Sequence, residues 1–203
     1  LIDAQTDEHL WAERFDRELT AKNLFAIQSE ISQKIADALK TTLTPEETKR
    51  INTMPTQDLV AFEAYIRGKQ LLATRKTSQI EKAIPEFRNA VELDPNFALA
   101  WVGVAYGYLL LVDYGSFNQQ EALAIRQDAV NRALEIDPLL SEAYVSLGLI
   151  HRDLGKHEEA EIAFKKAIEL KPSENYWIYE LGLICYAMNN DKEALKYILE
   201  AGE

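Results

Sequence analysis

The sequence predicts an all-α protein built as a stack of antiparallel helix pairs, preceded by a short β-hairpin. The main observation is a set of small and apolar residues that recurs 34 positions later, as Leu147-Gly148, Ala160 and Ala167 do in Leu181-Gly182, Ala194 and Ala201. Small residues at a fixed period mark places where stacked helices touch. Within each unit the apolar residues keep helical spacing, and a proline closes most units. A stack of this kind presents surface to another chain and does not by itself assemble a catalytic pocket.

The first 19 residues do not repeat and predict the hairpin. Trp11, Glu13 and Phe15 alternate along one face, which is typical of a strand. An isolated two-stranded hairpin is marginally stable in water. We therefore expect it to need a further strand, a packed helix or a second copy of itself.

Two helices are expected between the hairpin and the array. One spans about residues 23–41, with an apolar stripe that includes Leu24, Ile27 and Ile31. A capping box with proline at the first helical position starts another helix at Thr44. A break at Met54-Pro55 then separates residues 1–55 from an array over 56–203.

The clearest repeat unit covers residues 141–174. Its marker residues are Tyr144, Leu147-Gly148 and His151 in the first helix, then Ala160, Phe164, Ala167 and the closing Pro172. This order resembles the tetratricopeptide repeat (TPR) family, apart from a histidine where tyrosine is usual. The resemblance implies a right-handed superhelix whose first helices line a concave protein-binding surface.

Other units follow this pattern less regularly, giving about four helix pairs. The last unit begins near Asn175 and reaches the end of the sequence without a closing proline. The unit that opens at Trp101 carries nine additional residues, expected around 113–120, and Arg126 where alanine is usual. The earliest unit has a regular second helix, but its first helix, about residues 58–74, aligns poorly.

The N-terminal third carries a second resemblance. Its markers are the runs Leu1-Ile2-Asp3-Ala4, His9-Leu10-Trp11-Ala12-Glu13-Arg14-Phe15-Asp16-Arg17 and Phe25-Ala26-Ile27-Gln28. They resemble the end of a TolB-like domain, which often precedes TPR arrays in bacterial class III adenylate/guanylate cyclases and winged-helix transcriptional regulators. The resemblance covers about residues 1–175 and implies a sensing or docking region of a bacterial signalling protein. The catalytic or DNA-binding domain of those proteins has no counterpart in this sequence.

The amino-acid composition limits the classes of partner and the compartment that we expect. Lys and Arg number 22 against 33 Asp and Glu, a net charge of −11, which argues against a nucleic-acid surface. No apolar run approaches transmembrane length, so we expect no membrane insertion by this part. The single cysteine excludes an internal disulfide and favours the cytoplasm. The alternative is the periplasmic side of a longer, membrane-anchored protein.

The partner-binding residues are expected on the first helices, opposite the Leu-Gly packing stripe. They are Leu99, Val102, Tyr106, Leu109, Val145, Leu149, Arg152, Tyr176, Tyr179, Leu183 and Tyr186. This face is apolar and rich in tyrosine, which favours an apolar or helical peptide. A clamp for an acidic C-terminal tail is not expected, because Arg152 is its only basic residue. The alternative is that several of these residues are core between repeats, and for any single tyrosine the two interpretations are equal.

Catalytic chemistry is not expected. His151 and His157 straddle a turn with no third ligand, so the sequence predicts no metal site. Cys185 lacks a histidine partner, and there is no phosphate loop or nucleophile motif. The sequence therefore predicts a non-enzymatic interaction module without a cofactor. Two alternatives remain: self-association, as a homodimer, through the hairpin, and sensing of a small ligand.

Overall fold

The computed structural model describes residues 21–38, 48, 55–172 and 175–202. Contacts divide the chain into two compact units, Leu1–Phe62 and Glu63–Glu203, which are described separately. The predicted hairpin and the capping box at Thr44 lie outside the described residues. The assignment of residues 1–55 to a TolB-like piece therefore stays a prediction.

The first unit contains one well-described helix, α1 (Ala21–Ala38). It confirms the predicted amphipathic helix and begins two residues earlier than expected. Ile27, Ile31 and Ile35 are half-buried along its apolar stripe. On its polar side, Lys34 Nζ lies 3.4 Å from Glu30 Oε1, one helical turn away.

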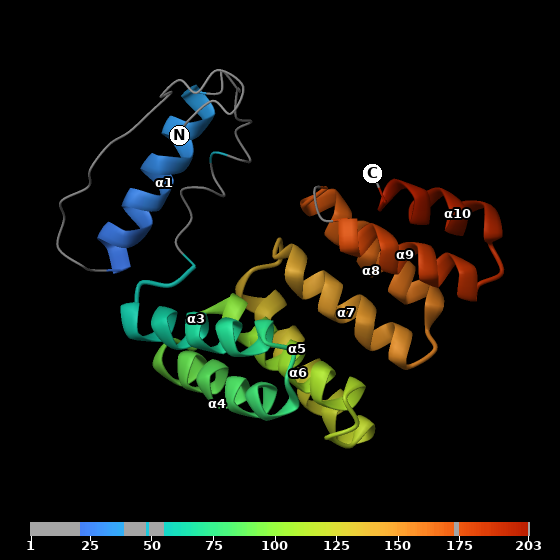
Figure 1. Cartoon of the computed structure of the whole chain (residues 1–203), viewed down its shortest axis with the longest axis horizontal. Coiled ribbons are helices and arrows are strands. Elements are labelled where there is room, and N and C mark those ends of the chain that lie inside the picture. Colours follow the sequence, from blue (N-terminus) through green and yellow to red (C-terminus); the bar gives the residue numbers. More distant parts are fainter. Residues whose placement is uncertain (1–20, 39–47, 49–54, 173–174, 203) are drawn as a thin grey trace. The chain divides into compact units, whose positions relative to one another are not determined.

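The array consists of consecutive helix pairs, coloured from teal to red in Figure 1. The helices are α3 (Leu59–Ala73), α4 (Thr77–Leu93), α5 (Ala98–Asp113), α6 (Gln119–Ile136), α7 (Ser141–Asp153), α8 (His157–Leu170), α9 (Asn175–Ala187) and α10 (Asp191–Glu200). No strand occurs among the described residues. The predicted all-α stack of helix pairs is confirmed.

The pairs stack through their neighbours in the chain. Helices α5 and α6, α7 and α8, and α9 and α10 pack within pairs, whereas α4–α5, α6–α7 and α8–α9 pack between them. Helix α5 also contacts α7 directly. The first helices α5 and α7 of two successive pairs therefore lie side by side, and we call the surface formed by the first helices the inner face.

Glycine allows the closest approach within the pairs. A Cβ on Gly148 would lie 2.9 Å from Phe164 Cε2, and a Cβ on Gly182 would lie 2.8 Å from Ile198 Cγ1. Both distances are shorter than real Cβ contacts, so the facing helices pack directly on the glycine backbone. The expected close approach of the two helices at Gly148 is confirmed, and Gly182 makes the equivalent contact in the last pair.

The pair that the sequence aligned poorly is regular in the structure. A Cβ on Gly68 of α3 would lie 2.7 Å from the ring of Phe87 in α4, the contact that Gly148 makes with Phe164. The two contact positions are 19 residues apart here and 16 apart in the later pair. Because three additional residues lie between these positions, an alignment that assumes one fixed spacing does not detect the repeat.

The nine-residue insertion lengthens one pair by about a turn on each helix. Compared with α7 and α8, three residues extend the end of α5, two enter the turn and four extend the start of α6. Gly115 takes a positive φ of 69° in the turn. The side chain of Asn118 then caps α6 by accepting hydrogen bonds from the amides of Gln120 and Glu121.

Candidate functional site

The structure divides the predicted partner-binding residues into three groups by burial. Leu109, Val145 and Leu149 are buried; Leu99, Val102, Tyr106, Arg152 and Leu183 are half-buried; Tyr176, Tyr179 and Tyr186 are exposed. No contact with a ligand tests any of them, so their binding role stays a prediction. Their packing nevertheless separates the side chains that a ligand could reach from those that hold the array together.

The three buried residues join consecutive repeats. Leu109 of α5 and Leu149 of α7 belong to one apolar cluster with Trp177 and Leu181 of α9. Leu149 is 2% exposed, so a ligand cannot reach it without opening the stack. In the free chain these side chains are core, which is the alternative that the sequence left open.

Arg152 is part of an ion-pair network instead of standing alone. Its Nη1 lies 2.9 Å from Glu180 Oε2 on α9, and its Nη2 lies 3.1 Å from Asp153 Oδ1. Burial tends to lower the pKa of Arg152, but the two carboxylates outweigh it and the pKa is raised. A guanidinium already held by two acids is poorly placed to clamp an incoming carboxylate.

Arg126 extends the network into the preceding pair. It occupies the alanine position of α6, is 1% exposed, and places Nη1 2.6 Å from Asp153 Oδ2 on α7. A buried guanidinium needs such a partner, because an unpaired charge in the interior is costly. The sequence showed only that Arg126 stands where alanine is usual. Its partner Asp153 lies 27 residues away, so no local sequence pattern predicts the pair.

Two further side chains border this network on the inner face. The hydroxyl of Tyr176 donates to Glu180 Oε1 at 2.7 Å. Burial and this hydrogen bond raise the pKa of Tyr176 above its usual range. Asp113, on the additional turn of α5, has a raised pKa because partial burial outweighs the attraction of Arg152.

Tyrosines converge on a second cation, Arg75, which follows α3. Its Nη1 donates to the hydroxyl of Tyr106 at 3.1 Å, and the guanidinium lies 6.0 Å from the centre of the same ring. This hydrogen bond is the main cause of the raised pKa of Arg75, and the phenols of Tyr114 and Tyr176 add to it. We call Tyr106 of α5, Tyr114 in the turn that follows it and Tyr176 of α9, together with Arg75, the tyrosine cluster.

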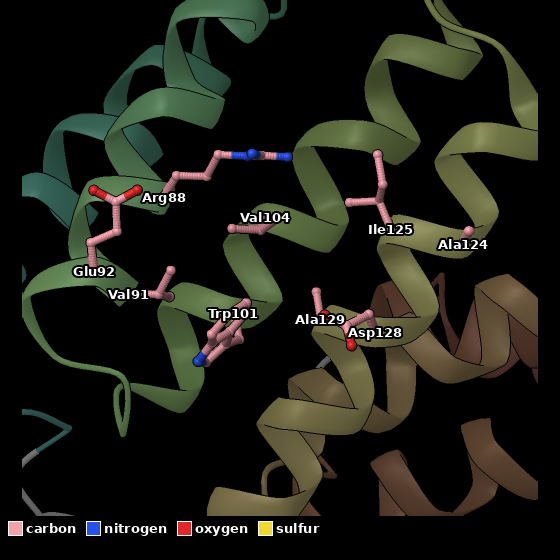
Figure 2. Close-up of a pocket in the computed structure, with 9 residues that line it drawn as sticks. All are labelled: Arg88, Val91, Glu92, Trp101, Val104, Ala124, Ile125, Asp128 and Ala129. Atoms are coloured by element: carbon pink, nitrogen blue, oxygen red, sulfur yellow. The ribbon is translucent and has the colours of Figure 1, made fainter.

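A shallow cavity of about 520 Å³ lies away from these residues, between α4 and α6 (Figure 2). Trp101 and Val104 of α5 form its floor, while Arg88 and Asp128 stand on opposite rims. The sequence did not predict this cavity, because its walls come from three helices with no shared spacing. Its charged rims carry both signs and fit no ligand class in particular.

Cys185 is a buried thiol, and no metal-binding cluster occurs among the described residues. Cys185 is 1% exposed, and burial raises the pKa of its thiol, which makes the reactive thiolate less accessible. Within the described residues, no group of three or more His, Cys, Asp and Glu side chains is placed to hold a metal ion. No helix in the described part of the chain is both long and apolar enough to cross a membrane.

Comparison with known proteins identifies the class. The tetratricopeptide repeat family matches residues 141–174, the unit that the sequence marked as clearest. The helix pairs and the glycine contacts have the architecture that this family match predicts. The predicted resemblance to tetratricopeptide-repeat proteins is confirmed, and residues 141–174 are matched as one such repeat.

Full-length relatives include two bacterial proteins. A protein of Rhizobium meliloti (strain 1021) that is named as an adenylate cyclase is 28% identical over 170 residues, covering 80% of this chain. The transcriptional regulator HilA of Salmonella typhimurium is 26% identical over 154 residues, covering 76% of this chain. In both cases the chain spans 28% of the relative's own length. The predicted similarity to cyclases and transcriptional regulators is confirmed at this level of identity.

Solved structures share the fold. The tetratricopeptide protein TTC0263 of Thermus thermophilus has a TM-score of 0.59 at 16% identity, covering 89% of this chain and 86% of that one. The first TPR domain of Spaghetti (RPAP3), solved with the HSP90 peptide SRMEEVD, has a TM-score of 0.53 at 20% identity, covering 64% of this chain and 96% of that one. The same architecture therefore serves as a peptide-binding domain in another protein.

Proposed function

We propose that this chain is a non-catalytic protein-interaction module of a bacterial signalling protein, which binds an apolar or helical peptide on its inner face. The observation that carries the proposal is the tyrosine cluster. Tyr114 and Tyr176 are 45% and 53% exposed, and Tyr106 accepts a hydrogen bond from the guanidinium of Arg75. Exposed aromatic side chains brought together by several helices are typical of binding hot spots.

The charges of the inner face support an apolar ligand over an acidic tail. Arg126 and Arg152 are both bonded to carboxylates, Asp153 and Glu180, within the array. A ligand carboxylate would have to displace these pairs, and breaking a buried pair costs about 3–5 kcal/mol. A peptide that buries apolar side chains against the tyrosines meets no such cost.

The signalling context rests on the relatives. One is named as an adenylate cyclase and another as a transcriptional regulator. The chain spans 28% of the length of each, so it corresponds to one region of each relative. We infer a regulatory or docking role for that region and no cyclase or DNA-binding activity of its own.

A capture experiment tests the inner face. Cell lysate is passed over the wild-type chain and over Tyr106→Ala/Tyr176→Ala, and the bound proteins are identified by mass spectrometry. Each truncated hot spot weakens binding by about 2 kcal/mol, or roughly 30-fold, so the partner should be lost from the variant.

The matched control is Ile162→Ala on α8, because Ile162 is 70% exposed and lies outside the inner face. The control should retain the partner, and all three proteins should unfold at similar temperatures. A partner held equally by wild type and Tyr106→Ala/Tyr176→Ala would show that it binds elsewhere.

A further inference from the structure

The turn after α3 shares its backbone conformation with the turns after the other first helices, but differs from them in one side chain. The residue two positions beyond the end of each first helix has a positive φ: 56° at Arg75, 69° at Gly115, 71° at Gly155 and 57° at Asn189. In each turn the amide of this residue donates to the carbonyl oxygen three residues earlier, at 2.8 to 3.1 Å. Of the four turns, the one after α3 carries a long, charged side chain at this position.

The left-handed conformation is unfavourable for arginine. The Cβ of an L-residue crowds the following carbonyl oxygen, so this position favours glycine and tolerates asparagine. Arg75 is therefore strained where the glycines and the asparagine of the other turns are not. Strained residues cluster at binding and active sites, where a particular side chain is needed. We therefore expect the side chain of Arg75 to have a function that a glycine in the same turn could not supply.

The guanidinium of Arg75 and the hydroxyl of Tyr106 form a pair of hydrogen-bond donors. Arg75 Nη1 donates to the Tyr106 oxygen at 3.1 Å, which uses one of the several N–H donors of a guanidinium. The Tyr106 oxygen accepts in this bond, so its own O–H proton remains free to donate. Among the described contacts, no protein group accepts that proton. Both groups are reachable, since Arg75 is exposed and Tyr106 is half-buried.

No carboxylate of the described residues balances the charge of Arg75. The groups that raise its pKa are the phenols of the tyrosine cluster, and its hydrogen bond goes to one of them. Arg152, by contrast, is held by Asp153 and Glu180. An exposed guanidinium beside a free phenol O–H is complementary to a carboxylate, which can accept hydrogen bonds from both.

We propose that Arg75 and Tyr106 bind the carboxylate of an internal aspartate or glutamate in the peptide ligand. The carboxylate accepts hydrogen bonds from the guanidinium and from the hydroxyl, while apolar side chains of the same peptide cover the tyrosine rings. The inference rests on the proposed inner-face function and adds a charged anchor to an otherwise apolar ligand. The site differs from a clamp for an acidic C-terminal tail, because the acid lies within the peptide and Arg152 keeps its own carboxylates.

Selection from a random peptide library displayed on phage tests the proposal without a known partner. The peptides are fused to the coat protein through their C-termini, so every carboxylate that is selected is internal. The wild-type chain should enrich peptides with an aspartate or glutamate beside apolar residues. Arg75→Asn should enrich the same apolar pattern without the acid. Asparagine is the matched replacement, because Asn189 has the same turn conformation in the last pair.

A synthetic peptide then measures the contact. The most enriched sequence is made with an amidated C-terminus and a fluorescein label, together with a second peptide in which the amide residue replaces the acid. In fluorescence anisotropy, Arg75→Asn and the amide peptide should each weaken binding about tenfold. The two changes together should weaken binding little more than either alone, because they remove the same contact. Tyr106→Phe should weaken the acidic peptide and leave the amide peptide unchanged.

Two controls separate a binding role of Arg75 from general effects. Arg132→Asn removes an arginine side chain that is 57% exposed on the second helix α6, and it changes the net charge of the chain equally. This variant should bind the acidic peptide as wild type does. Arg75→Asn should unfold at the wild-type temperature or above, because asparagine relieves the strain of the turn. Lost binding in a fold of unchanged or greater stability is not expected of a residue whose role is structural.

The outcomes distinguish this inference from the inner-face function on which it rests. Selected peptides that are lost in Tyr106→Ala/Tyr176→Ala but carry no internal acid would overturn the carboxylate site and leave the inner-face function standing. Arg75→Asn that binds the acidic and the amide peptide equally less well, with a lower unfolding temperature, would make Arg75 a structural residue and equally overturn the site. A selection that enriches no peptide dependent on the tyrosines would overturn both.

Discussion

The α5–α6 and α7–α8 pairs share one repeat pattern but fill its closest contact differently. In α7–α8, Gly148 accepts the ring of Phe164, which is fully buried against it. In α5–α6 the same two positions hold Ala105 and Val130, which are 1% and 0% exposed. A larger residue on the first helix thus accompanies a smaller residue on the second. The repeat conserves the filled volume of this contact rather than the identity of either residue.

The two pairs differ more strongly at the neighbouring alanine position. Ala160 of α8 buries only a methyl group at this position, whereas Arg126 of α6 buries a charged guanidinium. The larger and charged side chain is accommodated because Asp153 of the next pair accepts its hydrogen bond at 2.6 Å. One junction is therefore held by apolar packing, and the other depends on an ion pair between repeats.

The largest expected effect comes from breaking that ion pair. Asp153→Ala leaves Arg126 buried without its carboxylate, which should lower the free energy of unfolding by about 3–5 kcal/mol. Urea denaturation followed by circular dichroism measures the change. Replacing both partners, as Arg126→Met/Asp153→Leu, should recover most of the loss, because apolar groups of similar volume can substitute for a buried pair. A double variant as unstable as Asp153→Ala would mean that the charge is not the cause.

The second-largest effect is expected from changing the side-chain volume at the contact between Ala105 and Val130. Val130→Phe adds a ring opposite Ala105, so overpacking should cost about 1–3 kcal/mol. Adding Ala105→Gly recreates the combination found in α7–α8 and should restore at least half of the loss. Thermal unfolding of the single and double variants measures the coupling. Additive effects of the two substitutions would refute the idea that these positions compensate each other.

A smaller effect is expected where the lengthened pair meets the ion-pair network. Burial raises the pKa of Asp113 above its ordinary value of 3.8. A carboxyl with a raised pKa stabilises the fold below its unfolded pKa and loses this contribution as the pH rises through its folded pKa. Asp113→Asn should therefore be more stable than wild type at pH 7, by less than about 1 kcal/mol because the group is largely exposed. The difference should vanish below pH 4 in urea titrations; a variant less stable at pH 7 would contradict this.

The smallest effect is expected at the exposed hydrogen bond from Arg75. Tyr106→Phe removes the phenol oxygen that accepts from Nη1 at 3.1 Å but keeps the ring beneath the guanidinium. The free energy of unfolding should fall by no more than about 0.5 kcal/mol. Thermal unfolding checks this, with Tyr114→Phe as the control, since no hydrogen bond from Arg75 reaches Tyr114 in the described contacts. A loss above about 1.5 kcal/mol would show that Tyr106 supports the core.

The order of helices was largely predictable from the sequence, because the period and the glycine contacts are local patterns. The regular α3–α4 pair was obscured by three additional residues between Gly68 and Phe87. The partner of Arg126 could not be predicted, since it depends on how two pairs pack and not on spacing within either.

The predicted binding residues illustrate the same limit. Val145 and Tyr179 occupy one repeat position and share one helix face, yet one is 8% exposed and the other 41%. Their difference arises because a further helix pair packs beside α7, whereas none of the described helices packs on the same side of α9. A pattern within the unit defines the direction of a side chain, but the neighbouring pair decides whether that side chain is core or surface.

The lengthened α5–α6 pair has a consequence for recognition along the array. A stack of equal units has translational symmetry, so an elongated ligand could shift by one 34-residue step and meet a similar surface. The additional turn of α5, with Asp113 at its end and Tyr114 just beyond, occurs once among the described pairs. A ligand that contacts this turn can bind in only one register along the array. The insertion thus makes one repeat different from the others, so that it can fix the register of a ligand along the array.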